Sequence, residues 1–148
     1  MYKVEYTTSE EETIAFGCSL AHDLQPGDVV CLFGDLGAGK TTLIKGIVGF
    51  LTATHPDNVC SPTYSYLNIY PGVVSVFHFD LYRLEDAEAF LSLGFEEYLL
   101  GQGVCCIEWS ERIETILPPH TRRITMEHIG EEKRNITCKQ LSPKGESF

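Results

Sequence analysis

Two runs of consecutive apolar residues stand out in the chain, at 29–33 and 104–107, each bounded by polar or turn-forming residues. Runs of this length and composition predict strands that are buried on both faces of a sheet. A segment with helical spacing of its apolar residues follows each run, at 43–51 and 110–117. Strands that alternate with helices favour parallel pairing, so we expect an α/β fold with a central, mixed but largely parallel sheet and helices on both faces.

The remaining segments predict shorter elements around this sheet. Residues 3–6 alternate as a strand does, and Ser9 and Glu12 have the spacing of a capping box, in which Ser9 caps a helix and Glu12 reaches back to the Ser9 amide. Alternating aromatic and β-branched segments predict two added β-hairpins, one of them with Pro71 and Gly72 in a type II turn. The hairpin strands are expected at 64–70 with 73–80 and at 122–129 with 133–141, a further helix at 85–93 and a short amphipathic segment at 95–100.

The chain has 148 residues, which predicts one domain at 1–141 followed by a polar tail at 142–148. No apolar run approaches the roughly 20 residues that cross a bilayer, and the first residues lack the apolar stretch of a signal peptide. We therefore expect a cytoplasmic protein that does not use a membrane. The formal charge of −10 disfavours direct nucleic-acid binding, because nucleic-acid binders neutralise phosphates with clustered cations. A protein partner or a locally bound small anion fits this charge better.

Six cysteines occur in the chain without a Cys-x-x-Cys pair. Four of them lie inside apolar stretches, at positions 18, 31, 105 and 106. That distribution favours the reduced core thiols of a cytosolic protein over zinc ligands or a disulfide framework.

Candidate chemistry begins directly after the first apolar run. Residues 34–41, Gly-Asp-Leu-Gly-Ala-Gly-Lys-Thr, match the Walker A pattern of a P-loop nucleotide-binding site. Its glycines let backbone N–H groups turn toward phosphate oxygens, and the following helix aims its positive end at the same place. Lys40 is expected to reach the β- and γ-phosphates, and the Thr41 hydroxyl to bind Mg²⁺. No lysine is followed two positions later by aspartate, as in a guanine-specifying motif, so ATP is the expected nucleotide.

Two acidic residues close predicted strands, and both suit a site for phosphate-bound Mg²⁺. Glu108 follows four apolar residues, as a Walker B acid does, whereas Asp80 follows a strand that contains Ser75 and His78. We therefore expect Glu108 to bind the metal and Asp80 to orient or deprotonate the attacking water. The reverse order of these two roles stays open, as does a plain structural role for either acid at the end of its strand.

Other polar and aromatic residues near these strand ends have two interpretations each. Thr63, within a Ser-Pro-Thr-Tyr segment, either contacts the γ-phosphate or a Mg²⁺-bound water, as a switch segment does, or belongs to a turn that enters the hairpin. Arg83 either pairs with Asp80, the commoner arrangement, or contacts a phosphate as an internal arginine finger. His78 is by default a satisfied structural histidine, and its alternative is a proton donor at the strand end. Trp109 by default packs in the core, and its alternative is stacking or contact with a partner.

Four segments together resemble a known family. They are Gly-Asp-Leu-Gly-Ala-Gly-Lys-Thr-Thr at 34–42, Ser-Pro-Thr-Tyr at 61–64, His-Phe-Asp-Leu-Tyr-Arg-Leu at 78–84 and Glu-Trp at 108–109. In this order and spacing they resemble TsaE, also called YjeE, the bacterial ATPase subunit of the machinery that forms threonylcarbamoyladenosine in tRNA. The resemblance runs from about residue 5 to about residue 137, and it is far more specific than a Walker A match alone.

The resemblance implies a P-loop NTPase fold and a cytoplasmic, Mg²⁺-dependent ATPase that hydrolyses ATP weakly alone. It implies protein partners similar to TsaD and TsaB, which transfer the threonylcarbamoyl group to adenosine 37 of tRNA, and contact with tRNA only through them. By matching position, Lys40 and Asp80 would be catalytic and Thr41 and Glu108 would bind the metal. The nucleotide would be held by Glu10, Gly37, Ala38, Gly39, Lys40, Thr41, Thr42, Thr63 and Gly130. Glu10, in the acidic stretch 9–13, and Gly130 are matched by position rather than by a sharp motif.

We expect ATP with Mg²⁺ to order segment 61–64 and the strand end at Asp80 into a partner-binding surface, which hydrolysis then loosens. Hydrolysis is expected to be slow without the partner, because the sequence shows no second basic residue placed at the γ-phosphoryl charge, a group that contributes about 10³–10⁵ in rate. Two alternatives share the P-loop: a small-molecule or nucleoside kinase, and a nucleotide-gated interaction module without catalysis. Only five arginines are available for the basic lid of a kinase, which argues against that alternative.

Overall fold

The computed structural model describes residues 2–35 and 37–140, so the predicted polar tail at 142–148 lies outside the described residues. The described residues form a seven-stranded sheet in the order β1-β7-β6-β2-β5-β4-β3. Its strands are β1 (Tyr2–Thr7), β2 (Val29–Phe33), β3 (Leu67–Tyr70), β4 (Val76–Asp80), β5 (Val104–Glu108), β6 (Arg122–His128) and β7 (Arg134–Gln140). The helical segments are α1 (Glu10–Ala21), α2 (Lys40–Thr52), η1 (Pro56–Asn58), α3 (Ala87–Ser92), α4 (Glu96–Leu99) and η2 (Ser110–Ile116).

The four strands at the centre of the sheet run parallel. They are β6, β2, β5 and β4 in spatial order, and antiparallel partners complete the sheet on both sides, with β3 beside β4 and with β7 and β1 beside β6. Parallel neighbours need crossover connections, and the helical segments supply them. The predicted α/β fold with a parallel centre and two added hairpins is confirmed.

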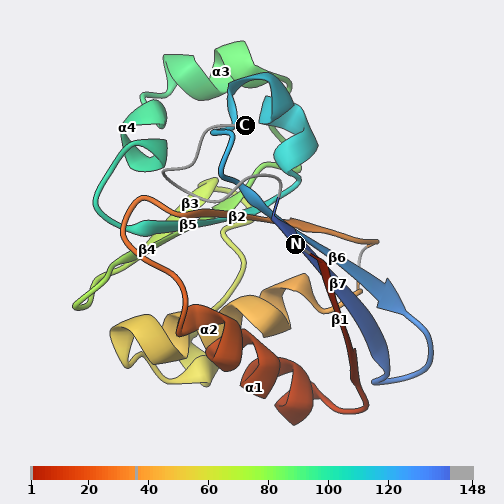
Figure 1. Ribbon diagram of the computed structural model, residues 1–148. Coiled ribbons are helices and arrows are strands. Elements are labelled where there is room, and N and C mark those ends of the chain that lie inside the picture. The colour runs from red at the N-terminus through yellow and green to blue at the C-terminus, as the bar shows by residue number, and fades with distance from the viewer. Residues whose placement is uncertain (1, 36, 141–148) are drawn as a thin grey trace.

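Helices cover both faces of the sheet, as Figure 1 shows. α1 and α2 pack on one face, whereas α3, α4 and η2 lie on the other. In β2, Val30 and Leu32 belong to the core beneath α1 and α2, and Val29 and Cys31 belong to the core on the opposite face. Both sides of this strand are therefore apolar, which explains why its sequence is an unbroken hydrophobic run.

α1 begins as the capping-box spacing predicts, with one difference. Ser9 caps the helix, and its Oγ accepts a hydrogen bond from the Glu12 N–H at 3.1 Å. The Glu12 carboxylate accepts from the N–H and the hydroxyl of Thr8, at 2.7 and 2.9 Å, instead of the predicted Ser9 amide. These two donors lower the pKa of Glu12, the N–H more than the hydroxyl. The Glu12 side chain thus contacts Thr8 instead of Ser9, and this contact ties the start of α1 to the residue that follows β1.

β3 and β4 form the predicted hairpin, with Leu67 opposite Phe79, but its strands begin at 67 and 76 rather than at 64 and 73. The predicted type II turn is wrong, because Gly72 does not have the left-handed backbone that such a turn requires. Glycine is required at position 72 because a side chain there would collide with the end of α2. A Cβ at this position would lie 2.6 Å from the Cα of Thr52, the last residue of α2.

The segment after β5 is less regular than the continuous helix that its sequence predicts. η2 consists of 3-10 turns, and Ile113 interrupts them with φ −127° and ψ 24°. The Ile113 side chain is fully buried in the core that η2 shares with α3. The backbone therefore leaves helical geometry where this side chain enters the core. No helix in the described part of the chain has the length and apolarity needed to cross a membrane.

All six cysteines carry free thiols. Cys31, Cys105 and Cys106 are buried between the sheet and its helices, as predicted, whereas Cys18 is only half-buried. Burial raises the pKa of Cys31 and of Cys105 from 9.0 to about 12, because a thiolate is poorly solvated in the core. Burial also raises the pKa of Cys106. These thiols therefore stay protonated at neutral pH.

The buried thiols predict a loss of stability at alkaline pH. In the unfolded chain they ionise near pH 9.0, whereas Cys31 and Cys105 of the folded protein stay protonated up to about pH 12. Their contribution to the free energy of unfolding is complete below the lower value and is lost as the pH rises toward the higher one. Urea denaturation at about pH 8 and about pH 10 should show this decline, and Cys105→Ala should reduce it. Identical pH dependence in wild type and C105A would contradict the prediction.

Candidate functional site

The loop between β2 and α2 holds the Walker A residues. Gly37 and Gly39 have φ values of 82° and 98°, a left-handed backbone that residues with a side chain rarely adopt. Gly39 is the N-cap residue of α2 and supplies no side-chain cap. The first N–H groups of a helix have no partner inside it, so this end of α2 offers donors together with the positive end of the helix dipole. Helix starts of this kind bind phosphate groups.

Lys40, the first residue of α2, is held against the protein. Its Nζ donates to the Gly34 carbonyl at 2.8 Å and lies 4.5 Å from the centre of the Trp109 ring. Trp109 has a left-handed φ of 62°, and its ring centre is 4.9 Å from that of Tyr82. The Lys40 residue is only 6% exposed and is held between a carbonyl and an aromatic face. Trp109 packs against the core, as expected by default, and also contacts the candidate site.

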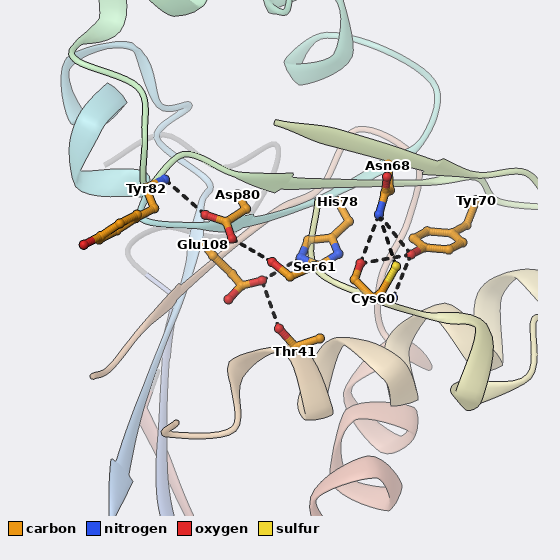
Figure 2. Close-up of polar contacts among 9 residues, drawn as sticks. All are labelled: Thr41, Cys60, Ser61, Asn68, Tyr70, His78, Asp80, Tyr82 and Glu108. Carbon is orange, nitrogen blue, oxygen red and sulfur yellow. Dashed lines mark hydrogen bonds and ion pairs between the residues drawn. The ribbon is translucent and has the colours of Figure 1, made fainter. Parts of the chain in front are cut away.

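Asp80 and Glu108 lie side by side at the carboxyl ends of β4 and β5, where the parallel register pairs them. Side chains alternate along a strand, so the two acids share a face with Val76 and Cys106, which pack in the core beneath α1 and α2. The start of α2 lies over this face. Thr41 Oγ1 donates to Glu108 Oε2 at 3.3 Å (Figure 2).

Asp80 has a different set of partners. Ser61 Oγ donates to its Oδ2 at 2.6 Å, and the Tyr82 N–H donates to its Oδ1 at 3.1 Å (Figure 2). The predicted switch segment is thus connected to the strand end through a side-chain contact. The Arg83 guanidinium lies 4.7 Å from the centre of the Tyr64 ring, and no ion pair among the described residues joins Arg83 to Asp80. The expected pairing of Arg83 with Asp80 is wrong.

His78 lies on the same strand as Asp80 and points toward Glu108, as Figure 2 shows. Its Nε2 is 2.7 Å from Glu108 Oε2, and the ring is fully buried. Glu108 Oε2 therefore contacts two side chains, His78 and Thr41. The His78 Nδ1 is buried without a hydrogen-bond partner. His78 is buried in the core, as expected by default, but only one of its two ring nitrogens has a hydrogen-bond partner among the described residues.

A cleft of about 520 Å³ lies at the carboxyl edge of the parallel strands, and it is lined by Lys40, Thr41, Asp80 and Glu108 but not by the buried His78. Glu10 lines a smaller pocket of about 140 Å³, which shares Gly39, Thr42 and Arg134 with the cleft. Ala38 is buried, and Gly130 lines neither pocket. The other residues that the sequence assigns to the site all line the cleft: Gly37, Gly39, Lys40, Thr41, Thr42, Thr63, Asp80 and Glu108.

Arg134, at the start of β7, is the residue of this region that sequence reasoning misses. Its Nε and Nη2 donate to the carbonyls of Ala38 and Gly37 at 2.8 and 3.1 Å, and its Nη1 donates to the Gly130 carbonyl at 3.4 Å. Arg134 therefore ties the phosphate loop to the closing hairpin. Arg134 and Arg83 both line the cleft, whereas the sequence indicated no second basic residue at the phosphates. No motif signals Arg134, because it lies 96 positions from Ala38 in the chain.

Comparison with known proteins decides the family. The sequence model of the family described as "Threonylcarbamoyl adenosine biosynthesis protein TsaE" matches residues 7–136. The chain belongs to the TsaE family. The tRNA threonylcarbamoyladenosine biosynthesis protein TsaE of Bacillus subtilis is 43% identical over 132 residues, which cover 88% of this chain and 81% of that protein. TsaE of Treponema pallidum is 37% identical over 129 residues, which cover 87% of this chain and 94% of that protein.

The likeness to TsaE proteins extends to three dimensions. The crystal structure of Bacillus subtilis YdiB superposes with a TM-score of 0.78 at 35% sequence identity, and the match covers 96% of this chain and 87% of YdiB. The resemblance carried by the four sequence segments is confirmed, and so is the expected P-loop NTPase fold.

The contacts of Arg134 predict a stability effect. Arg134→Ala should lower the free energy of unfolding by about 2 kcal/mol, because the loop carbonyls lose a charged donor. Lys133→Ala removes a neighbouring exposed cation and should change that free energy by less than about 0.5 kcal/mol. Urea denaturation of the two variants measures the difference. If R134A is as stable as K133A, the contact between loop and hairpin contributes nothing to the fold.

Proposed function

We propose that this protein binds ATP with Mg²⁺ and hydrolyses it as the ATPase subunit of the machinery that forms threonylcarbamoyladenosine at adenosine 37 of tRNA. The observation that carries the proposal is the left-handed loop at Gly37 and Gly39, which opens into the uncapped start of α2. Lys40, Thr41 and Glu108 line the same cleft. Membership of the TsaE family supports the biological process.

Phosphate binding uses main-chain groups first and Lys40 second. The N–H groups of the loop and of the α2 start are donors that need no side-chain rearrangement to bind phosphate oxygens. Lys40 has to exchange the Gly34 carbonyl and the Trp109 ring for a phosphate oxygen, which is the stronger partner because it is charged. Trp109 is a reporter of nucleotide binding, since its ring loses the cation beside it.

Thr41 and Glu108 fit Mg²⁺, which prefers hard oxygen ligands in octahedral geometry. Their two oxygens lie 3.3 Å apart. Neighbouring ligands of an octahedral ion with bonds of about 2.0–2.1 Å are roughly 2.9 Å apart, which is close to this spacing. Bound Mg²⁺ neutralises charge that develops on the phosphates. Among the hydrogen bonds of the described residues, Thr41 contacts Glu108 and not Asp80, which supports Glu108 as the metal residue.

We assign to Asp80 the role of orienting or deprotonating the attacking water. Ser61 and the Tyr82 N–H each occupy one of its oxygens, so the carboxylate is fixed while lone pairs remain for a water in the cleft. Lys40 and Asp80 are therefore the catalytic residues of the proposal. Ser61 and Thr63 both line the cleft. A bound nucleotide can therefore act on segment 61–64 through either residue.

The partner surface in this proposal is the rim of the cleft around Tyr64, Tyr82 and Arg83. Tyr64 is 80% exposed and Tyr82 is 50% exposed. The Arg83 guanidinium covers one face of Tyr64, so the rim combines aromatic and cationic groups, which are enriched in protein interfaces. We assign this rim to the threonylcarbamoyl-transfer subunits TsaD and TsaB. With a formal charge of −10, the chain contacts tRNA only through them.

Nucleotide binding is tested by isothermal titration calorimetry with ATP and Mg²⁺, and Trp109 fluorescence is recorded for the wild type. Wild-type protein should give a saturable change, and Lys40→Ala should weaken binding about tenfold or more, because a charged contact with a phosphate is lost. Lys45→Ala is the matched control, since it lies on the same helix outside the cleft and should bind as wild type does. A wild-type protein that ignores adenine nucleotides would end the proposal.

Hydrolysis is tested by measuring phosphate release with and without TsaD and TsaB. We expect slow turnover alone and faster turnover with the partners. Asp80→Asn should lower the rate about 10²-fold or more while nucleotide binding is retained, because water is no longer oriented by a carboxylate. Asp57→Asn, at an exposed acid, is the control. An unchanged rate in D80N would favour a nucleotide-gated module without catalysis, and equal rates with and without partners would contradict activation.

A further inference from the structure

His78 is a fully buried polar side chain with one unpartnered ring nitrogen. It lies in β4 and shares the face of Val76, which packs in the core beneath α1 and α2. The ring has no exposed surface, and its Nδ1 has no hydrogen-bond partner. An unpartnered buried polar atom destabilises a fold, and an aliphatic side chain of similar size would avoid this cost. The other ring nitrogen, Nε2, therefore has to account for a histidine at this position.

That other nitrogen, Nε2, lies 2.7 Å from Oε2 of Glu108, which is itself only 5% exposed. A carboxylate oxygen accepts, so Nε2 of the ring carries the hydrogen of this contact. The arrangement uses one side of the ring for Glu108 and leaves the other side unpaired.

The two donors that reach the Glu108 carboxylate from described residues share one of its oxygens. Oε2 accepts from Nε2 of His78 and from the Thr41 hydroxyl. Among the hydrogen bonds of the described residues, Oε1 takes part in none. Two donors on one oxygen, arriving from a strand and from a helix, fix the rotation of the carboxylate. The partners that hold a metal-binding carboxylate in place commonly change metal affinity when they are removed.

We propose that His78 is a positioning residue that holds the Glu108 carboxylate in the orientation in which it binds Mg²⁺. The inference rests on the proposed function, because it takes Thr41 and Glu108 as the metal residues. His78 sets the affinity of the nucleotide-bound protein for Mg²⁺. Among the described residues, no hydrogen bond joins His78 to the phosphate loop, so it leaves the affinity for the nucleotide itself unchanged.

The test is a Mg²⁺ titration, followed by Trp109 fluorescence, of protein that has been stripped of metal with chelator, desalted and then saturated with ADP. His78→Leu removes the donor and should raise the half-saturating Mg²⁺ concentration about tenfold or more. His78→Gln keeps an N–H donor at a similar reach and should restore most of the wild-type Mg²⁺ response. His120→Leu is the matched control, a histidine that contacts the Gly27 carbonyl outside the cleft, and should titrate as wild type does.

ADP affinity without Mg²⁺ and the urea unfolding midpoint are measured for every variant. We expect H78L to bind ADP in chelator as wild type does and to remain folded. The inference is overturned if H78L shows the wild-type Mg²⁺ response, if H78Q is impaired as strongly as H78L, or if H78L loses ADP binding in chelator. Failure of the wild type itself to respond to ADP or to Mg²⁺ would instead overturn the proposed function, so the two failures are distinguishable.

Discussion

The parallel register of β4 and β5 determines where the chemistry of this molecule lies. It places Asp80 beside Glu108, and the pairing of β5 with β2 brings both acids to the edge at which the phosphate loop leaves the sheet. The two-residue period of a strand turns both carboxylates toward the start of α2. A slip of one residue in either strand would turn its acid to the opposite face. For β5, such a slip would leave Thr41 without its carboxylate partner.

In the proposed function, a bound nucleotide would compete with the contacts of Lys40, and the contact of Asp80 with Ser61 would connect the cleft to the surface. Lys40 contacts the Gly34 carbonyl and the Trp109 ring, and Asp80 accepts from Ser61. Under the proposed function, a triphosphate would offer Lys40 a charged partner, and hydrolysis would take part of that charge away. The Ser61 contact joins the proposed catalytic acid to an exposed segment. A change in the cleft therefore has a short physical route to the proposed partner surface.

Features that depend on residues close together in the sequence could be predicted from it. Contacts between segments that are far apart in the sequence and meet across the sheet could not. The phosphate loop, the apolar strands β2 and β5, and the acids that close β4 and β5 are local patterns, and the structure brings them together. The contacts of Arg134 with Ala38 and of His78 with Glu108 depend on which strands become neighbours. Gly72 was assigned to a turn, but its role comes from the approach of α2. Packing of Ile113 likewise interrupts a helix that the local sequence favours.

The central claim is that main-chain N–H groups of the phosphate loop and the start of α2 bind nucleotide phosphates. A crystal structure of the protein with ADP and Mg²⁺ tests it most directly. We expect phosphate oxygens within hydrogen-bond distance of the N–H groups between Gly37 and Thr42, and the Lys40 ammonium moved from the Trp109 ring to a phosphate. ADP bound elsewhere, or beside N–H groups that point into solvent, would contradict the claim.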